Sequence, residues 1–276
     1  MRAPGRPTRS EAPPPALVLH AAERPDVHVA DALAPAYGPL IADAIERSIL
    51  ATGRCRLGLS GGGTPGPVYA WLRQHLPARC YGQLLVTFVD ERHLPVSDAT
   101  PGAWQAFDAE SNLRGAYEAW LAHVPLSPDR VLPMSLGGAL EAELLRFGRA
   151  FQAQFEGGLD VAILGAGPDG HVASLFPDHP GLDVDDVCLA VHDSPKPPRQ
   201  RISLALPVLQ RAGVAFVLAS GVAKQEMLSR AYAGDLALPV ARLRTPGRHR
   251  WLLDRDAARA ILAQHLDATP LSRSLP

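Results

Sequence analysis

The stretch that decides the fold reads DVAILGAGPDGHVASLFP and covers residues 160–177. An aliphatic, β-branched run followed by glycine predicts a buried strand. The turn after it carries Asp169 and His171, and we expect a short helical stretch from there to Pro177. In open α/β sheets, ligands bind at the carboxyl ends of the strands. A titratable imidazole at that edge therefore indicates catalytic chemistry.

The same turn matches the dinucleotide fingerprint G-x-G-x-x-G through Gly165, Gly167 and Gly170. Pro168 removes a backbone N–H where a pyrophosphate needs one, and Asp169 adds negative charge beside an anionic ligand. Pro177 also ends the following segment too early for the crossover helix of a βαβ unit. A dinucleotide site is therefore the weaker interpretation of this turn.

A second glycine cluster, LGLSGGGTP, follows another short apolar run at residues 57–65. Thr64 is a good N-cap, and Pro65 is a good first residue for the helix predicted next. The N–H groups of the glycine triplet can converge on an anion at the positive end of that helix, and the group comprises Ser60, Gly61, Gly62, Gly63 and Thr64. A flexible strand-to-helix turn is the alternative.

A third cluster, LLVTFVDERHLP at residues 84–95, is a β-forming run that ends in charged residues. Asp90, Glu91 and Arg92 cannot all be buried without partners, so the alternative to a binding role is a solvated loop with local ion pairs. Because three predicted strands each end in glycine or polar residues, we expect their ends to converge on one site.

Seven blocks in this order resemble the 6-phosphogluconolactonases, which are related to the glucosamine-6-phosphate isomerase/deaminases. The blocks are SGGGTP (60–65), VDERHLP (89–95), SN (111–112), LGAGPDGHVASLFP (164–177), DSPKPP (193–198), RISLALPVLQRA (201–212) and WLLD (251–254). The resemblance implies an α/β fold with a modified Rossmann-like, mostly parallel sheet and helices on both faces. It also implies hydrolysis of 6-phosphogluconolactone in the oxidative pentose phosphate pathway.

Hydrolysis of a phosphorylated sugar lactone needs an activated water, donors for the oxyanion and a cationic grip on the phosphate. His171 can take the water proton if it lies neutral beside the start of the short helix, and the resemblance supports it as the base; a helix-capping role is the alternative. Asp169 either orients the imidazole or binds a sugar hydroxyl. Arg92 and Lys196 are the best cations for the phosphate; the alternative for Lys196 is a solvated loop lysine.

The resemblance places Asp90 where the related deaminases carry a proton-transferring aspartate. Here we expect Asp90 to contact substrate or to pair with Arg92. The sequence also departs from the family pattern, with Pro168 where glutamate is common and a longer connection at residues 96–110. Trp104 and Phe107 within that connection suggest a lid over the site or a contact with a partner.

Composition agrees with one α/β enzyme domain. The chain has 276 residues, 47% of them hydrophobic, and a net charge of −1, which gives no support for binding nucleic acid. Its three cysteines are widely spaced, so neither a disulfide framework nor a zinc site is predicted, and no metal or cofactor is expected. Residues 1–15 read as a disordered Pro/Arg-rich tail without a membrane-spanning or signal segment, and residues 16–270 as one domain. A cytoplasmic location fits best; protein partners and oligomeric state are undetermined.

Further elements are expected as helices at Pro39–Leu50 and Leu140–Phe155 and as strands at Val187–Val191 and Val214–Ala219. Two other functions on the same fold compete with the lactonase. An amino-sugar phosphate isomerase/deaminase would need motifs other than SPKPP and GHVASLFP. A noncatalytic sugar-phosphate sensor would keep the glycine loop and lose the base, whereas His171 is present.

Overall fold

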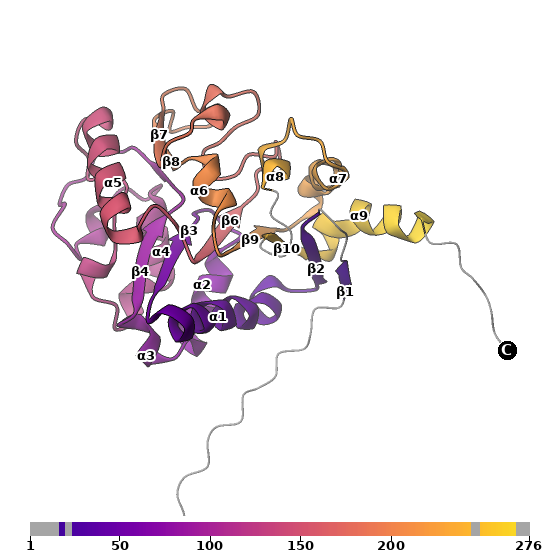
Figure 1. Cartoon of the computed structure of the whole chain (residues 1–276), viewed down its shortest axis with the longest axis horizontal. Helices are drawn as coiled ribbons and strands as arrows, with labels where there is room; N and C mark the ends of the chain where they lie inside the picture. The colour runs from indigo at the N-terminus through magenta and orange to yellow at the C-terminus, as the bar shows by residue number, and fades with distance from the viewer. Residues whose placement is uncertain (1–16, 20–23, 244–248, 269–276) are drawn as a thin grey trace, which may run out of the picture.

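The computed structural model describes residues 17–19, 24–243 and 249–268, and a seven-stranded sheet forms its centre (Figure 1). The strands lie in the order β1 (Leu17–Leu19), β2 (Asp26–Ala30), β10 (His249–Asp254), β9 (Val214–Ala219), β6 (Val161–Gly165), β3 (Cys55–Leu59) and β4 (Leu84–Phe88). Every described pair in this sheet is parallel except β1 with β2. The predicted α/β class with a mostly parallel, Rossmann-like sheet is confirmed.

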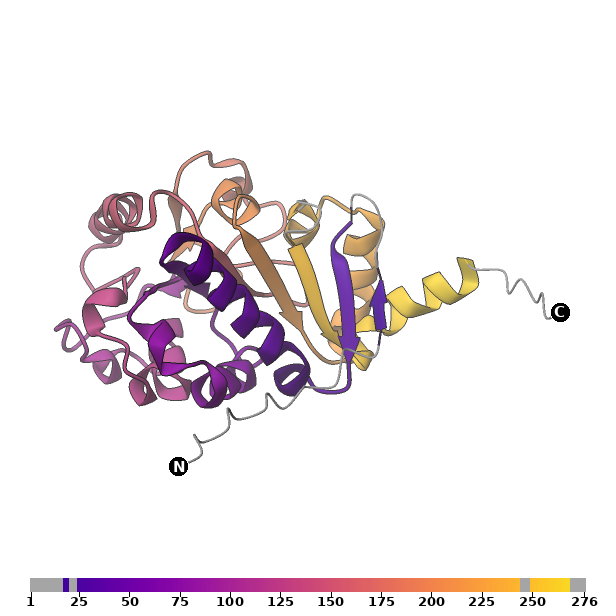
Figure 2. The same ribbon diagram turned by 60° about the horizontal axis from the view of Figure 1, so that its bottom comes forward.

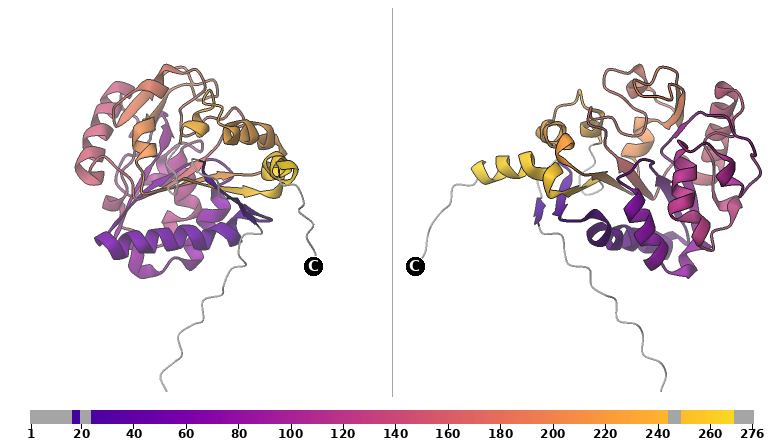
Figure 3. Two further views of the ribbon diagram at one scale, coloured as in Figure 1. Left: turned by 45° about the vertical axis from the view of Figure 1, so that its right-hand side comes forward. Right: turned by 180° about the vertical axis from the view of Figure 1, so that it is seen from behind.

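Helices cover both faces of this sheet, as expected. Figures 2 and 3 show α1 (Leu33–Thr52) and α2 (Gly66–His75) on one face, with α7 (Gln225–Ala233) and α8 (Pro239–Arg242) on the other. The remaining α-helices are α3 (Ala78–Tyr81), α4 (Asn112–Ala119), α5 (Leu140–Phe155), α6 (Leu206–Gln210) and α9 (Arg255–Ala268). Both faces of the central strands are therefore buried, which explains their continuous aliphatic runs.

The structure contains a second, antiparallel sheet that the sequence did not predict. Its order is β5 (Asp90–Arg92), β8 (Arg201–Leu204) and β7 (Cys188–Val191). Asp90 pairs with Ser203 and Arg92 with Arg201, so the charged residues after β4 continue as extended backbone and do not begin a solvated loop. The strand expected at Val187–Val191 begins one residue later and is an edge of this small sheet.

Local predictions differ from the structure mainly at element ends. The helix at Leu140–Phe155 and the strand at Val214–Ala219 have the expected bounds, whereas the helix expected at Pro39–Leu50 extends over Leu33–Thr52. Pro65 takes the N-cap position and α2 begins at Gly66, so the prediction that Thr64 caps this helix is wrong. The Thr64 hydroxyl lies 3.5 Å from Ser220 Oγ instead.

The short helical stretch expected between His171 and Pro177 does not form. Ala173 has a positive φ of 52°, and the Leu175 N–H donates to Val172 O at 3.0 Å. This tight turn reverses the chain before a helical turn can form. The idea that a helix start keeps His171 neutral, and the alternative that His171 caps a helix, therefore lose their basis.

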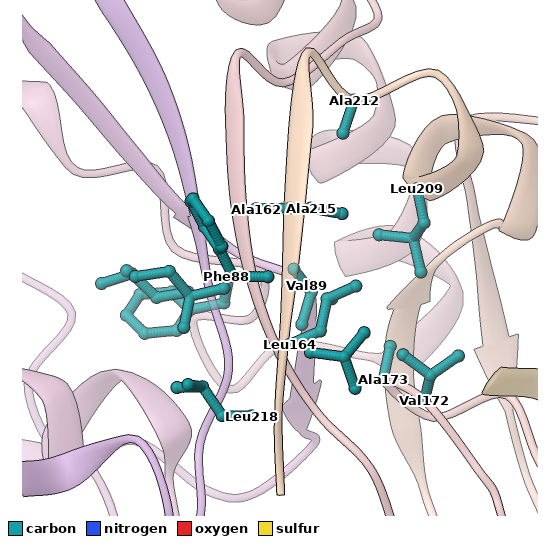
Figure 4. Close-up of a cluster of buried hydrophobic side chains, with 14 of the residues drawn as sticks. Phe88, Val89, Ala162, Leu164, Val172, Ala173, Leu209, Ala212, Ala215 and Leu218 are labelled. Carbon is teal, nitrogen blue, oxygen red and sulfur yellow. The ribbon is translucent and has the colours of Figure 1, made fainter. Parts of the chain in front are cut away.

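One buried cluster holds the strand ends and the His171 turn together. Figure 4 shows Val89, Leu164, Val172 and Leu218 among its side chains. Val89, Leu164 and Val172 are fully buried, and each lies within a few residues of a candidate site residue along the chain. Close packing at these positions leaves the backbone of the site little freedom to move.

The connection at residues 96–110 packs against the chain itself. Trp104 and Phe107 are each 3% exposed, and their rings meet edge-to-face with centroids 5.8 Å apart. The expectation that these side chains form a lid or a partner contact is wrong, because burying two aromatic rings in the core is more favourable than exposing them.

The ends of the chain and the predicted domain limits are only partly covered. Residues 1–15, expected to form a tail, and the limits 16 and 270 lie outside the described residues. Among the helices that the structure describes, none is both long and apolar enough to pass through a bilayer. Cys55, Cys80 and Cys188 are buried free thiols.

Candidate active site

The ends of several strands converge on one pocket of about 330 Å³. Of the predicted site residues, those lining the pocket are Ser60, Gly61, Gly62, Gly63, Thr64, Asp90, Arg92, His171 and Lys196. Asp169 does not line the pocket, but it contacts His171 and Lys196, which do. The fold thus brings together residues that lie up to 136 positions apart, from 60 to 196.

His171 and Asp169 form a close pair on the pocket wall. His171 Nδ1 lies 2.5 Å from Asp169 Oδ1, and the side chains are 18% and 33% exposed. The Phe176 ring packs against the imidazole with centroids 4.8 Å apart. A side chain at Gly167 would overlap His171, since an added Cβ would lie 2.0 Å from Nδ1. Glycine at 167 therefore allows the imidazole to occupy this position.

The charge on Asp169 is held by its neighbours. Burial by itself raises the pKa of Asp169, but the hydrogen bond with His171 and the charges of His171 and Lys196 outweigh burial and bring it well below its usual range. Asp169 is therefore a carboxylate at neutral pH and can only accept hydrogen bonds. Nδ1 of His171 must be the donor, which leaves Nε2 of the neutral ring as an acceptor.

Asp90 is 5% exposed and has a different partner from the one expected. Ser174 Oγ donates to Asp90 Oδ2 at 2.6 Å, Asn112 Nδ2 lies 3.1 Å from Oδ1, and Arg201 Nη1 lies 3.8 Å from Oδ2. The expected pairing of Asp90 with Arg92 is wrong, because the antiparallel strand β8 places the buried Arg201 against Asp90.

Glu91 fixes the start of helix α4. Its carboxylate accepts the N–H groups of Asn112 and Leu113 at 2.7 and 2.9 Å, and the Ser111 hydroxyl at 3.0 Å. A negative charge at a helix N-terminus is favourable. Burial raises the pKa of Glu91 to about 7, against these hydrogen bonds and one from Arg92 N–H, which lower it.

The glycine loop offers unpaired backbone donors to the pocket. Within the described part of the chain, the N–H groups of Gly61, Gly62 and Gly63 donate to no other residue. Gly62 has a φ of +90°, which favours glycine, and an added Cβ on Gly61 would lie 1.8 Å from Asn112 Oδ1. The loop therefore rests on Asn112, and its glycines line the pocket with free backbone N–H groups.

Two further cations, which the sequence analysis did not single out, also line the pocket. Lys224 Nζ donates to Ala166 O at 2.7 Å, and burial, followed by the charge of Lys196, lowers its pKa. Arg201 donates to the carbonyls of Lys196 and Pro198, each at 3.1 Å. The signal for Lys224 was available, because it follows the predicted strand Val214–Ala219 as the other site residues follow theirs.

The expected cations occupy the pocket in different ways. The Arg92 guanidinium donates to Glu110 O through Nη1, and its buried Nε has no partner in the described chain. Lys196 Nζ lies 3.4 Å from Asp169 Oδ2. Together with Lys224 they give the pocket a local positive charge that the net charge of −1 does not reveal. An anionic ligand fits such a site.

A family model described as glucosamine-6-phosphate isomerases/6-phosphogluconolactonase matches residues 28–252. The 6-phosphogluconolactonase of Mycobacterium tuberculosis is 34% identical over 241 residues, which cover 83% of this chain and 94% of that protein. The human 6-phosphogluconolactonase is 33% identical over 227 residues, which cover 76% of this chain and 82% of the human protein.

Solved structures show the same architecture. The 6-phosphogluconolactonase of Trypanosoma brucei superposes with a TM-score of 0.72 at 27% identity, covering 86% of this chain and 99% of that one. A monomeric glucosamine-6-phosphate deaminase superposes with a TM-score of 0.65 at 21% identity, covering 85% and 99% of the two chains. The second likeness shows a shared fold alone.

Proposed function

The chain belongs to the glucosamine-6-phosphate isomerase/6-phosphogluconolactonase family, and from this premise we propose that it hydrolyses 6-phospho-D-glucono-1,5-lactone to 6-phospho-D-gluconate by a metal-free, His171-assisted mechanism. It is a hydrolase of the 6-phosphogluconolactonase class, like the curated relatives it matches over most of its length. The observation that carries the mechanism is the His171–Asp169 pair on the wall of a cationic pocket.

His171 acts as general base and then as general acid. Nε2 takes a proton from water while the water oxygen bonds to the lactone carbonyl carbon, and Asp169 stabilises the imidazolium that forms. The tetrahedral intermediate then breaks its bond to the ring oxygen, which receives the proton back from His171. One water is consumed, and the open-chain acid ionises at neutral pH. Such proton transfer contributes about 10²–10⁴-fold in rate.

The substrate phosphate binds to the cationic groups and backbone donors of the same pocket. Arg92, Lys196 and Lys224 supply positive charge, and the glycine-loop N–H groups with the Ser60 and Thr64 hydroxyls supply donors. Asp90 is engaged by Ser174, Asn112 and Arg201, so we assign it to shaping the pocket wall and keep it as the second candidate base.

No metal is assigned to this reaction because the His171–Asp169 pair already supplies the base. Among the described residues, no group of at least three histidine, cysteine or acidic side chains could hold a metal ion. A cytoplasmic location and the lack of a nucleic-acid partner stay predictions from the sequence.

Turnover of the phosphorylated lactone tests the proposal, with spontaneous hydrolysis subtracted from every trace. We expect the purified protein to hydrolyse it at an undiminished rate in the presence of a chelator. Loss of activity in chelator and its return on adding a divalent cation would exclude the metal-free mechanism. Release of ammonia from glucosamine 6-phosphate without lactone hydrolysis would assign the chain to the deaminase activity instead.

A further inference from the structure

Lys196 differs from the other pocket cations in how its charged end is held. Lys224 Nζ donates a 2.7 Å hydrogen bond, and Arg201 is buried and bonded to several carbonyls. Lys196 Nζ lies 3.4 Å from Asp169 Oδ2 with no hydrogen bond between them, and the Lys196 side chain is 43% exposed. An exposed ion pair of this kind contributes little, so the ammonium can leave Asp169 at small cost.

The backbone of Lys196, by contrast, is fixed. Its N–H donates to Ser194 Oγ at 3.3 Å, and its carbonyl accepts from Ser194 Oγ at 2.8 Å and from Arg201 Nη2 at 3.1 Å. The side chain therefore turns about an anchored point, and its ammonium can reach a new partner within the pocket without moving the loop.

Asp169 is shared between His171 and Lys196. One carboxylate oxygen accepts from His171 and the other faces Lys196. A positive charge on Lys196 opposes the appearance of a second positive charge on the imidazole, as like charges do at short range. The strength of His171 as a base thus depends on where the Lys196 ammonium lies.

We propose that Lys196 is a movable counter-ion, paired with Asp169 in the free enzyme and with the substrate phosphate in the complex, so that phosphate binding leaves Asp169 to His171 alone. This rests on the proposed function of the pocket. The other charged groups around the pair keep their partners: Lys224 holds Ala166 O, Arg201 faces Asp90, and Arg92 holds Glu110 O. Lys196 acts on the chemistry through Asp169 and is a positioning residue in that sense.

Binding of the phosphorylated substrate therefore makes His171 a stronger base. A lactone without phosphate would leave Lys196 on Asp169 and meet a weaker base, even when it fills the same pocket. The proposal therefore links recognition of the phosphate to kcat, beyond its effect on affinity.

NMR titration of the His171 ring tests this directly, with the signal assigned from the His171→Asn spectrum. In Lys196→Gln we expect the ring to titrate about 0.5–1 pH unit higher than in the wild type, because a nearby positive charge is gone. Arg92→Gln is the matched control, since it removes a pocket cation with no contact to Asp169 among the described residues, and we expect less than half of that shift. Saturating 6-phosphogluconate should raise the titration midpoint more in the wild type than in Lys196→Gln.

Equal rises in the wild type and in Lys196→Gln would mean that Lys196 stays on Asp169, and would overturn the proposal. An unchanged midpoint in Lys196→Gln without ligand would overturn it as well. Lys196→Arg, which keeps the charge, should restore the wild-type midpoint and shows that the effect is not a folding defect. The titration needs no turnover, so a protein with unequal rises that fails to hydrolyse the lactone would refute the proposed hydrolysis and leave only the exchange of Lys196 between Asp169 and a bound phosphate.

Discussion

Two loops leave neighbouring strands at the carboxyl edge of the sheet and offer opposite kinds of groups to the pocket. After β6, the turn at residues 165–176 closes its own backbone: Gly167 N–H donates to His171 O at 2.9 Å and Gly170 N–H to Gly167 O at 3.0 Å. After β3, the loop at residues 60–65 leaves the N–H groups of its glycines without acceptors among the described residues.

The difference shows that the loop after a strand can offer a ligand either side-chain groups or backbone N–H groups. Each of the two needs a different loop sequence. The turn that presents the imidazole pairs the N–H groups of Gly167 and Gly170 within itself and buries flanking apolar residues such as Val172. A loop that presents N–H groups has no side chains in the way. Substitutions in the first should therefore change the rate of the chemical step, and substitutions in the second should change affinity.

The largest effect is expected for His171→Asn, in the turn after β6. We expect kcat to fall by about 10²–10⁴-fold with the affinity for 6-phosphogluconate nearly unchanged, because the imidazole acts mainly in the transition state. The measurement is turnover alongside the melting temperature. A folded variant with near-wild-type turnover would remove His171 from the mechanism and make Asp90 or Asp169 the next candidate base.

Glu91→Ala tests the support beneath the glycine loop. It leaves the N–H groups of Asn112 and Leu113 without their buried acceptor, and we expect a loss of about 2–4 kcal/mol in the free energy of unfolding. Chemical denaturation measures this loss. Because Asn112 supports Gly61, KM for the lactone should rise more than kcat falls. A loss of kcat alone would place Glu91 in the chemistry of the His171 turn.

The pH dependence of stability gives a second test of Glu91. Burial raises its folded pKa from 4.5 to about 7, so the folded state favours the protonated form. Its contribution to stability is then fully present below pH 4.5 and is lost as the pH rises through about 7. The free energy of unfolding of the wild type, relative to Glu91→Gln, should fall over that window. A difference that stays constant with pH would contradict this assignment.

Substitutions of the pocket cations should mainly change the affinity for the substrate. Arg92→Ala should raise KM for the phosphorylated lactone by about 10- to 100-fold, which corresponds to about 1.5–3 kcal/mol for a charge-assisted contact. Lys196→Ala should raise KM by less, since the Lys196 ammonium must leave Asp169 to reach the phosphate, and kcat should stay near the wild-type value because Asp169 is then left to His171 alone. Unphosphorylated gluconolactone is the control substrate, and its KM should change little in Arg92→Ala. Equal use of both lactones by the wild type would refute the phosphate assignment.

The smallest effect is expected for a substitution in the glycine loop, and it tests whether this loop contributes only to affinity. Gly62→Ala places a side chain at a φ of +90°, which costs about 1–2 kcal/mol, and should raise KM by about 5- to 30-fold with little change in kcat. Gly82→Ala is the matched control, because Gly82 has a φ of −65° and open space around it. A kcat effect in Gly62→Ala larger than its KM effect would show that the loop takes part in the chemical step.

Much of the fold and of the candidate site followed from local patterns. Aliphatic runs ending in glycine or charged residues gave the strands β3, β4 and β6, because burial on both faces demands continuous apolar sequence. The same strand ends gave Asp90, Arg92 and His171, since parallel strands bring their carboxyl ends to one edge. The helix expected after His171 failed because the positive φ at Ala173 is stabilised by packing of the turn, which no helical periodicity reports.

Sequence by itself determined the α/β class, the family resemblance and the residues at the ends of the strands, because these depend on short-range composition and order. Only the tertiary structure decided which charged side chains form ion pairs with each other. The antiparallel pairing of β5 with β8 brought Arg201 to Asp90 in place of Arg92, and the convergence of separate loops set Lys196 against Asp169. Strand pairing and burial bring together charged residues that are distant along the chain. The free energy of each contact depends on its neighbours in three dimensions, and spacing in the sequence does not encode those neighbours.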